Sequence, residues 1–194
     1  MSRRLHLLTV LIGATAMFVG CERNAGQPAA PSPLTNAQPA LAGQPAQMAA
    51  KGAAQHVVTM FDACDPETFN AQLGAGTCTR SGGVRFDAFV DQLTKHHSIG
   101  AWHFAPPEVM MRVGERLVAT NRGGETHTFT EVADFGGGKV PPLNEGLLPA
   151  PECAASQNIA AGQQVDIRGL AEGDHLFQCC IHPWMRAMVK VEQD

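Results

Sequence analysis

The chain has 194 residues, of which 44% are hydrophobic, 16% charged and 6% aromatic, so it is long enough for one ordinary domain and too short for a large multidomain assembly. Fourteen Lys and Arg against eighteen Asp and Glu give a net charge of -4, which excludes the basic footprint of a nucleic-acid-binding protein and a polybasic membrane patch. Twenty Gly and thirteen Pro with no Tyr favour a turn-rich, β-rich fold.

Residues 1–20 are predicted to be an export signal. Two arginines at positions 3 and 4 precede an apolar run from Leu5 to Val19, which is the order of a signal peptide and shorter than the roughly 20 residues of a spanning helix. Gly20 followed by Cys21 resembles the lipobox of bacterial lipoproteins, which implies that Cys21 is acylated. Phe18 stands where that box usually has Leu, so plain secretion stays open as the alternative. We expect a periplasmic protein anchored to a membrane through Cys21.

Residues 21–54 are expected to form a flexible tether. Positions 22–54 hold eleven Ala, five Pro, four Gln and three Gly, with no aromatic residue. Such a segment cannot bury enough apolar surface to offset the entropy cost of ordering. A disordered spacer beside a lipid-modified cysteine would let a folded head reach partners away from the membrane.

Residues 55–97 are interpreted as a helical extension packed on the main domain. Asp65 followed by Pro66 is a helix start, and glycines at 74 and 76 end the pattern, so the sequence predicts a helix over Pro66–Leu73. Apolar residues at 86, 89, 90 and 93 have helical spacing and predict a second helix.

Residues 98–194 have the alternating apolar pattern of half-buried strands. Short strands separated by Gly and Pro favour a sandwich or barrel. The predicted strands lie near residues 102–104, 109–113, 117–119, 128–132, 165–170, 175–179 and 188–191.

One loop between two predicted strands carries metal-binding side chains. Cys179, His182 and Met185 place a thiol, an imidazole and a thioether within seven residues. Thiolate and thioether favour Cu(I), imidazole also suits Cu(II), and Cys plus two His with a weak axial Met is the ligand set of blue-copper centres. His127 can supply the second imidazole, because it follows a predicted strand that ends at Asn121.

The order His127, Cys179, His182 and Met185 along the chain is similar to the order of the ligands in a cupredoxin. The Cys-x-x-His-x-x-Met pattern at 179, 182 and 185 resembles the short ligand loop of amicyanins, and the resemblance covers residues 98–194, about half of the chain. It implies an all-β Greek-key β-sandwich that holds one copper ion through His127, Cys179, His182 and Met185. The implied activity is one-electron transfer between redox partners rather than catalysis. Asn121 and Thr128 are implied to tie the loop of the first histidine to the cysteine loop.

Which of two adjacent thiols binds the metal follows from side-chain alternation. Cys179 shares parity with Phe177 and alone gives the Cys-x-x-His spacing, so we choose it over Cys180. A vicinal disulfide between the two is the strained alternative.

The remaining four cysteines are an even number for an oxidising compartment. We hypothesise disulfides Cys64–Cys78, around the first helix, and Cys153–Cys180, the latter mainly by elimination, with other pairings open.

The resemblance also implies that His182 lies near the surface, with Trp184 on an apolar rim where a redox protein docks; simple loop packing is the alternative role of Trp184. Met185 fits the axial position better than Met188, and His175 is expected to be a hydrogen-bonded edge residue. Two other functions remain open: a protein that stores or delivers copper, and a small enzyme with an open copper position.

Overall fold

The computed structural model describes residues 54–144 and 146–193. The predicted signal peptide, Cys21 and residues 21–53 of the predicted tether lie outside the described residues. No helix within the described part of the chain is long and apolar enough to cross a membrane.

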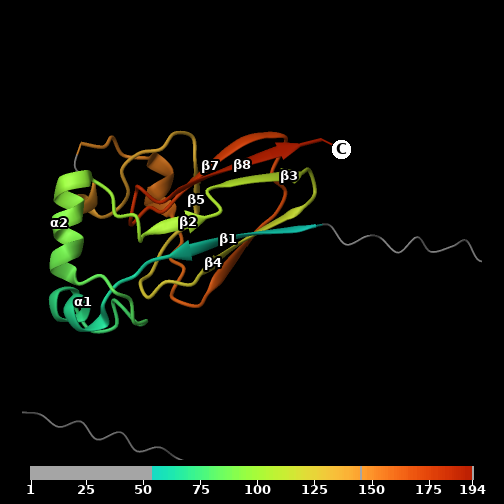
Figure 1. The fold of residues 1–194 in the computed structure, drawn as a ribbon. Coiled ribbons are helices and arrows are strands. Elements are labelled where there is room, and N and C mark those ends of the chain that lie inside the picture. The colour runs from blue at the N-terminus through green and yellow to red at the C-terminus, as the bar shows by residue number, and fades with distance from the viewer. Residues whose placement is uncertain (1–53, 145, 194) are drawn as a thin grey trace, which may run out of the picture. The chain divides into compact units, whose positions relative to one another are not determined.

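Two four-stranded sheets form the body of the fold (Figure 1). The first has the strand order β2-β1-β4-β6 and the second β3-β8-β7-β5. Each sheet mixes antiparallel pairs with one parallel pair, β1 with β4 and β3 with β8. The elements are β1 (Gln55–Phe61), α1 (Pro66–Leu73), α2 (Phe86–His96), β2 (His103–Ala105), β3 (Glu108–Arg112), β4 (Arg116–Asn121), β5 (Thr130–Val132), η1 (Pro141–Leu143), η2 (Pro151–Ala155), β6 (Gln164–Ile167), β7 (Gly173–Gln178) and β8 (Arg186–Glu192).

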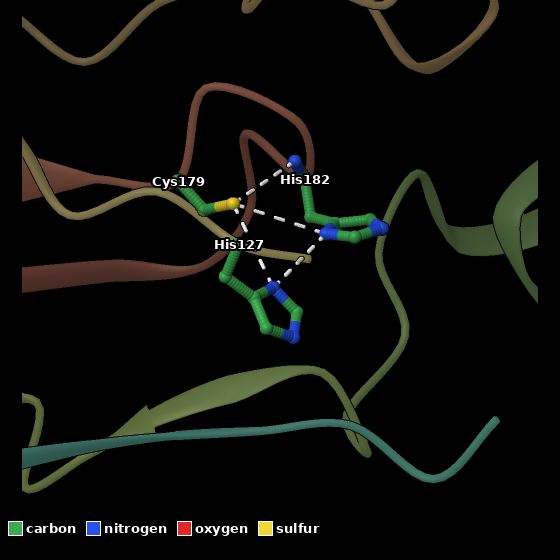
Figure 2. Close-up of side chains that lie close together, drawn as sticks. All are labelled: His127, Cys179 and His182. Carbon is green, nitrogen blue, oxygen red and sulfur yellow. Dashed lines mark hydrogen bonds between the residues drawn. The ribbon is translucent and has the colours of Figure 1, made fainter. Parts of the chain in front are cut away.

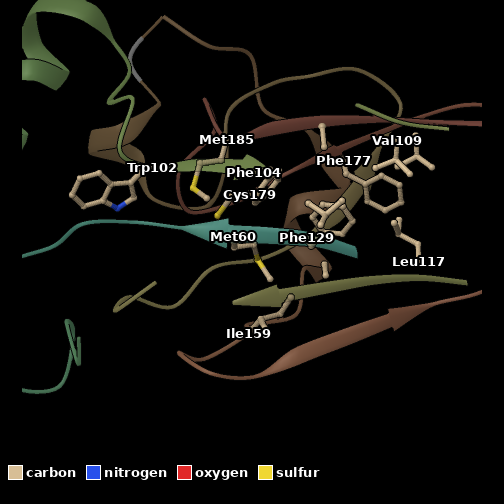
Figure 3. Packing of buried hydrophobic residues seen from close by; sticks show 14 of the residues in the cluster. Met60, Trp102, Phe104, Val109, Leu117, Phe129, Ile159, Phe177, Cys179 and Met185 are labelled. Carbon is tan, nitrogen blue, oxygen red and sulfur yellow. The ribbon is translucent and has the colours of Figure 1, made fainter. Parts of the chain in front are cut away.

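The apolar side chains of both sheets meet in one core, so the all-β sandwich is confirmed. In β8 the buried residues alternate with exposed ones, as a strand with one inward face requires. Phe129 and Phe177 stack with ring centroids 4.5 Å apart (Figure 3). The chain passes repeatedly from one sheet to the other, as Greek-key connections do.

The sandwich begins earlier than the sequence predicts. Residues 55–97 were expected to lie outside it, but β1 is an inner strand of the first sheet, paired with β2 on one side and β4 on the other. Val58 and Met60 point into the core and are fully buried. The boundary at residue 98 is therefore wrong, because seven residues after the Ala/Gln-rich segment complete a sheet whose other strands are far along the chain.

Both predicted helices are present, at one end of the sandwich (Figure 1). Asp65 caps α1 by accepting a hydrogen bond from the Thr68 N–H at 2.9 Å. Phe86 and Phe89 of α2 contact Phe69 of α1, with centroids 5.3 and 5.4 Å from it, and Phe89 also contacts Trp102 at 4.9 Å. The helices are thereby joined to the sandwich through aromatic packing.

Both hypothesised disulfides are confirmed. Cys64–Cys78 closes the segment that contains α1. Cys153–Cys180 ties η2 to the residue directly after Cys179. Cys179 is the one cysteine of the described residues outside a disulfide, and it is buried.

Candidate metal centre

Three side chains from two loops converge at the end of the sandwich near the helices. His127 lies in the loop between β4 and β5, and Cys179 and His182 lie in the loop between β7 and β8. Their ligand atoms lie within 4.8 Å of one another, and all three residues are buried. Figure 2 shows the sulfur and one nitrogen of each imidazole directed at a common point.

The distances between these atoms fit a shared metal ion. Cys179 Sγ lies 3.8 Å from Nδ1 of His127 and 3.8 Å from Nδ1 of His182, and the two Nδ1 atoms are 3.3 Å apart. Metal–ligand bonds of about 2.0–2.3 Å, as at zinc sites with the same ligand types, would separate such atoms by about 3.3–3.8 Å. The donor set of one sulfur and two imidazole nitrogens is one that copper accepts.

The sulfur is prepared to be a thiolate. The backbone N–H groups of Thr128 and His182 each donate to Cys179 Sγ at 3.4 Å. Burial raises the pKa of this thiol, but hydrogen bonds and charges from His127 and His182 outweigh burial and hold the pKa well below its usual value. The thiolate is the form that binds metals.

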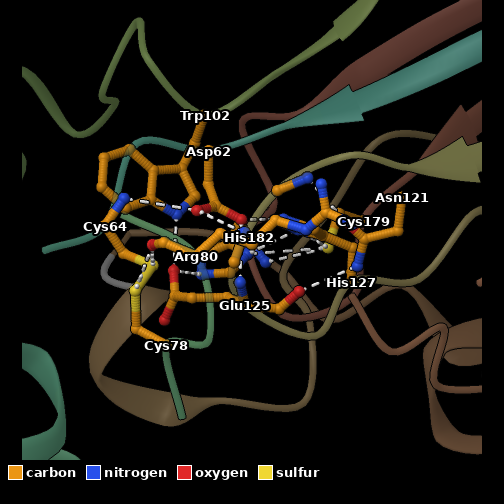
Figure 4. Close-up of polar contacts among 12 residues, drawn as sticks. Asp62, Cys64, Cys78, Arg80, Trp102, Asn121, Glu125, His127, Cys179 and His182 are labelled. Carbon is orange, nitrogen blue, oxygen red and sulfur yellow. Dashed lines mark hydrogen bonds and ion pairs between the residues drawn. A yellow bond between two sulfur atoms is a disulfide. The ribbon is translucent and has the colours of Figure 1, made fainter. Parts of the chain in front are cut away.

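A buried carboxylate that the sequence analysis missed fixes the orientation of His127. Asp62, directly after β1, has its side chain 1% exposed, and its Oδ2 lies 2.9 Å from His127 Nε2 (Figure 4). It also accepts hydrogen bonds from the N–H groups of Gly124 and Glu125, both at 3.0 Å. A proton held on Nε2 leaves the Nδ1 lone pair for a metal.

The pKa values agree with this pairing. Burial raises the pKa of Asp62, but the hydrogen bond from His127 and those from Glu125 and Gly124 bring it down to about 2. Burial lowers the pKa of His127, whereas the bond to Asp62 and the contact with Cys179 raise it to about 9. Asp62 is therefore an anion at neutral pH, as a hydrogen-bond acceptor for a ligand imidazole should be.

A second missed carboxylate faces His182. Glu125 Oε2 lies 3.6 Å from His182 Nε2 and accepts a 2.6 Å hydrogen bond from Trp102 Nε1. Burial raises the pKa of Glu125. The sequence signal for Glu125 was its position two residues before His127. Asp62 is distant in sequence from every candidate ligand, so no local pattern indicates that it supports His127.

The two predicted supporting residues have different roles. Thr128 Oγ1 accepts from the Cys180 N–H at 2.7 Å, which ties the His127 loop to the cysteine loop. Asn121 does not make that connection as the resemblance implies. Its Nδ2 donates to the carbonyl oxygens of Glu125 and Ile159, both at 2.8 Å, so it holds the His127 loop to the segment before β6.

Met185 lies in the same buried cluster as Cys179 (Figure 3). Its N–H donates to the His182 carbonyl at 2.9 Å, and its carbonyl accepts from the Cys179 N–H at 3.0 Å, so it closes the ligand loop. Met188 is more than one-third exposed on β8.

His182 is less accessible than the resemblance implies. Its exposed fraction is 3%, because aromatic residues surround it. The ring centroids of Trp102 and Trp184 lie 6.5 and 5.5 Å from that of His182. The ring centroid of Phe89 on α2 lies 6.3 Å from that of Trp184. Trp102 in turn packs on Phe69 of α1 and on Phe89 of α2, two helices that the resemblance does not include.

Solved structures with a similar course of the chain include a cupredoxin and amicyanins. A purple cupredoxin from Nitrosopumilus maritimus is 21% identical over 48% of this chain and 86% of its own, with a TM-score of 0.35. Amicyanin from Paracoccus versutus is 21% identical over 49% of this chain and 77% of its own, also with a TM-score of 0.35. A Cu(I) amicyanin variant is 24% identical over 46% of this chain and 73% of its own, with a TM-score of 0.33. No family model and no curated protein matches the chain.

Proposed function

We propose that the chain is a mononuclear type 1 copper protein that relays single electrons between redox partners and performs no catalysis of its own. The observation that carries the proposal is the convergence of Cys179 Sγ with Nδ1 of His127 and Nδ1 of His182 in a buried cluster. Copper bound there would supply a Cu(II)/Cu(I) one-electron couple.

The chain's own residues keep the ligands in place. Fast one-electron transfer requires little rearrangement of the ligands, so they must be held by the protein. Asp62 orients the ring of His127, and Thr128 ties the His127 loop to the cysteine loop. The Cys153–Cys180 disulfide anchors the residue after Cys179. Met185, buried within the ligand loop, is proposed as a weak fourth ligand.

We further propose that the protein is exported to the periplasm and held at a membrane through an acylated Cys21. Two disulfides support an oxidising compartment, and the order of residues 1–21 supports the signal and the anchor. Metabolic labelling with a fatty acid tests the anchor. Label on the native chain that is absent from Cys21→Ser supports it, and equal labelling of both chains contradicts it.

The copper assignment is tested by the visible spectrum of the copper-loaded, disulfide-intact protein. We expect an intense thiolate-to-copper charge-transfer band that Cys179→Ser abolishes. Met188→Leu, an exposed methionine on β8, is the matched control and should keep the band. A weak spectrum without a charge-transfer band would contradict the proposal.

Two further measurements separate the carrier from the other functions. A reversible one-electron couple in voltammetry with the metal retained supports electron relay. Loss of copper to a chelator within minutes would instead favour storage or delivery, and turnover of a small substrate at the copper would favour an enzyme. We expect the reversible couple and slow exchange, because the three ligands are buried.

A further inference from the structure

A cavity of about 670 Å³ lies directly against the candidate metal centre. This volume is within the range of small-molecule sites, about 300–1,000 Å³. Its walls come from α1, α2, the segment around η1 and the loop that carries His182. Glu125 and the candidate ligand His182 line it, so an occupant would lie beside the candidate metal centre.

The walls of the cavity are apolar and aromatic. Phe69, Phe86, Phe89 and Trp184 line it together with Leu143. Phe69 and Phe89 meet edge to face, with centroids 5.4 Å apart. Aromatic walls favour a flat ring through stacked and edge-to-face contacts.

The polar groups at the metal end define what else the occupant must carry. Glu125 is 6% exposed, and its carboxylate accepts one hydrogen bond from Trp102 Nε1. The carboxylate can accept further hydrogen bonds through its remaining lone pairs. Trp184 has a buried Nε1 without a hydrogen-bond partner in the described part of the chain. A hydroxyl group can donate to a carboxylate and accept from an indole N–H.

Apolar residues that are unusually exposed also line the cavity. Leu73 is 52% exposed, Val90 43% and Leu147 39%. They give the cavity an apolar entrance through which an uncharged molecule can pass without desolvating a charge.

We propose that this cavity binds a small, uncharged, hydroxylated aromatic molecule of the hydroquinone or phenol class, with its ring against the phenylalanines and its hydroxyl toward Glu125. Binding needs no metal, whereas a role of the bound molecule as electron donor rests on the proposed function. The helices α1 and α2 thus build a small-molecule site where an exposed imidazole was expected.

The test uses the full, metal-free chain with intact disulfides and tetramethylhydroquinone under anaerobic conditions. We expect saturable one-to-one binding, which calorimetry and tryptophan fluorescence both measure; of the two tryptophans, Trp184 lies in the cavity wall. Tetramethylbenzene, which has the same ring and methyl groups without hydroxyls, should bind at least about tenfold more weakly, because it displaces water from the Glu125 carboxylate without donating a hydrogen bond in its place.

Variants at the entrance locate the bound probe. Val90→Glu and Leu147→Glu place a charge at the apolar entrance and should weaken binding at least about tenfold, with the circular dichroism spectrum unchanged. Val57→Glu is the matched control, since Val57 is similarly exposed at 44% on β1 and does not line the cavity. It should leave the affinity unchanged.

The outcomes separate this inference from the copper assignment. No saturable binding, equal affinity for both probes, or equal affinity of all three variants overturns the cavity proposal. If the metal-free chain binds the hydroquinone while the copper-loaded chain lacks a charge-transfer band, the cavity proposal stands and the copper function fails. The reverse result leaves copper binding intact and removes the small-molecule site.

Discussion

Asp62 acts on the candidate metal centre entirely as a hydrogen-bond acceptor. It accepts from His127 and from the N–H groups of Cys64, Gly124 and Glu125. In Asp62→Asn, the amide nitrogen must face two of these donors, and the neutral amide oxygen is a weaker acceptor than a carboxylate, so the His127 ring is held less firmly. We expect copper affinity to fall about 10- to 100-fold, as when other partners of ligand histidines are removed.

The change is measured by competition with a copper chelator at pH 7. Asp91→Asn is the control, because Asp91 is an exposed carboxylate that pairs with Lys95 on α2. Equal copper affinity of Asp62→Asn and the native chain would show that Asp62 does not position the ligand.

His175 predicts a pH dependence of stability away from the metal centre. Its Nδ1 lies 2.6 Å from Glu131 Oε1, and this bond raises the pKa of His175. The pKa of His175 in the folded state thus exceeds its unfolded value of about 6.5. The His175–Glu131 pair therefore stabilises the folded state fully below about pH 6.5, and this stabilisation is lost as the pH rises through the folded-state pKa. His175→Gln should cost about 0.5–1 kcal/mol of unfolding free energy in urea at pH 5.5 and less at pH 9. An equal cost at both pH values would contradict the assignment.

Among the residues of the candidate metal centre, the sequence could predict those that are close together in the chain, and not those that only the fold brings together. Cys179, His182 and Met185 lie in one loop, where the spacing of ligand types is itself the signal. Asp62 is 65 residues from His127, and a carboxylate after a strand is ordinary in any sequence. The partner of a ligand is set by strand pairing, which only the three-dimensional structure shows.

The loop from β5 to η1 passes so close to the ligand loop that a side chain does not fit. A Cβ at Gly138 would collide with the carbonyl of Cys180, the residue after the ligand Cys179. Gly138→Ala must therefore push the two loops apart. We expect a loss of about 1–3 kcal/mol in the free energy of unfolding, as for other overpacking changes, and a shifted charge-transfer band.

Gly83→Ala is the matched control for this change, because a Cβ at Gly83 meets no atom within 4 Å. Urea titration of the two variants gives the difference. Equal stability would mean that the β5–η1 loop does not restrain the ligand loop.

The disulfide around α1 fastens the helical segment that packs on Trp102, a neighbour of His182. Cys64 and Cys78 are 14 residues apart and fully or almost fully buried. Closing a loop of about 15 residues stabilises by about 3 kcal/mol through the entropy of the unfolded chain. Cys64→Ala with Cys78→Ala should lower the free energy of unfolding by about that amount, measured in urea under oxidising conditions. An unchanged midpoint would show that the bridge adds no stability.

Elements with strong local signals were predicted well, and β1 was not. The cap at Asp65 and the spacing of Phe86 and Phe89 are local signals that predicted α1 and α2. β1 begins directly after an Ala/Gln-rich stretch, and its parallel pairing with β4 joins residues about 60 positions apart. No turn next to β1 signals that partner, since parallel strands are connected by long crossovers.

Across the whole molecule, the segment before residue 98 completes the sandwich and equips the candidate metal centre. β1 fills the position between β2 and β4, and Asp62 follows it into contact with His127. The helices after it pack on Trp102 and Trp184, the neighbours of His182, and supply part of the cavity wall. Residues 98–194 alone thus contain the candidate ligands but lack an inner strand.

This dependence predicts the outcome of truncation. A chain of residues 54–194 keeps all the described elements, and we expect it to unfold cooperatively and bind copper. A chain of residues 98–194 loses the buried Val58 and Met60 and leaves the edge of β4 that pairs with β1 without its hydrogen-bond partner. Each large buried side chain removed costs about 2–5 kcal/mol. Since domains are stable by only about 5–15 kcal/mol, we expect no cooperative thermal transition and no near-ultraviolet circular dichroism from the shorter chain. A folded, copper-binding 98–194 fragment would show that β1 is an addition to the sandwich rather than part of it.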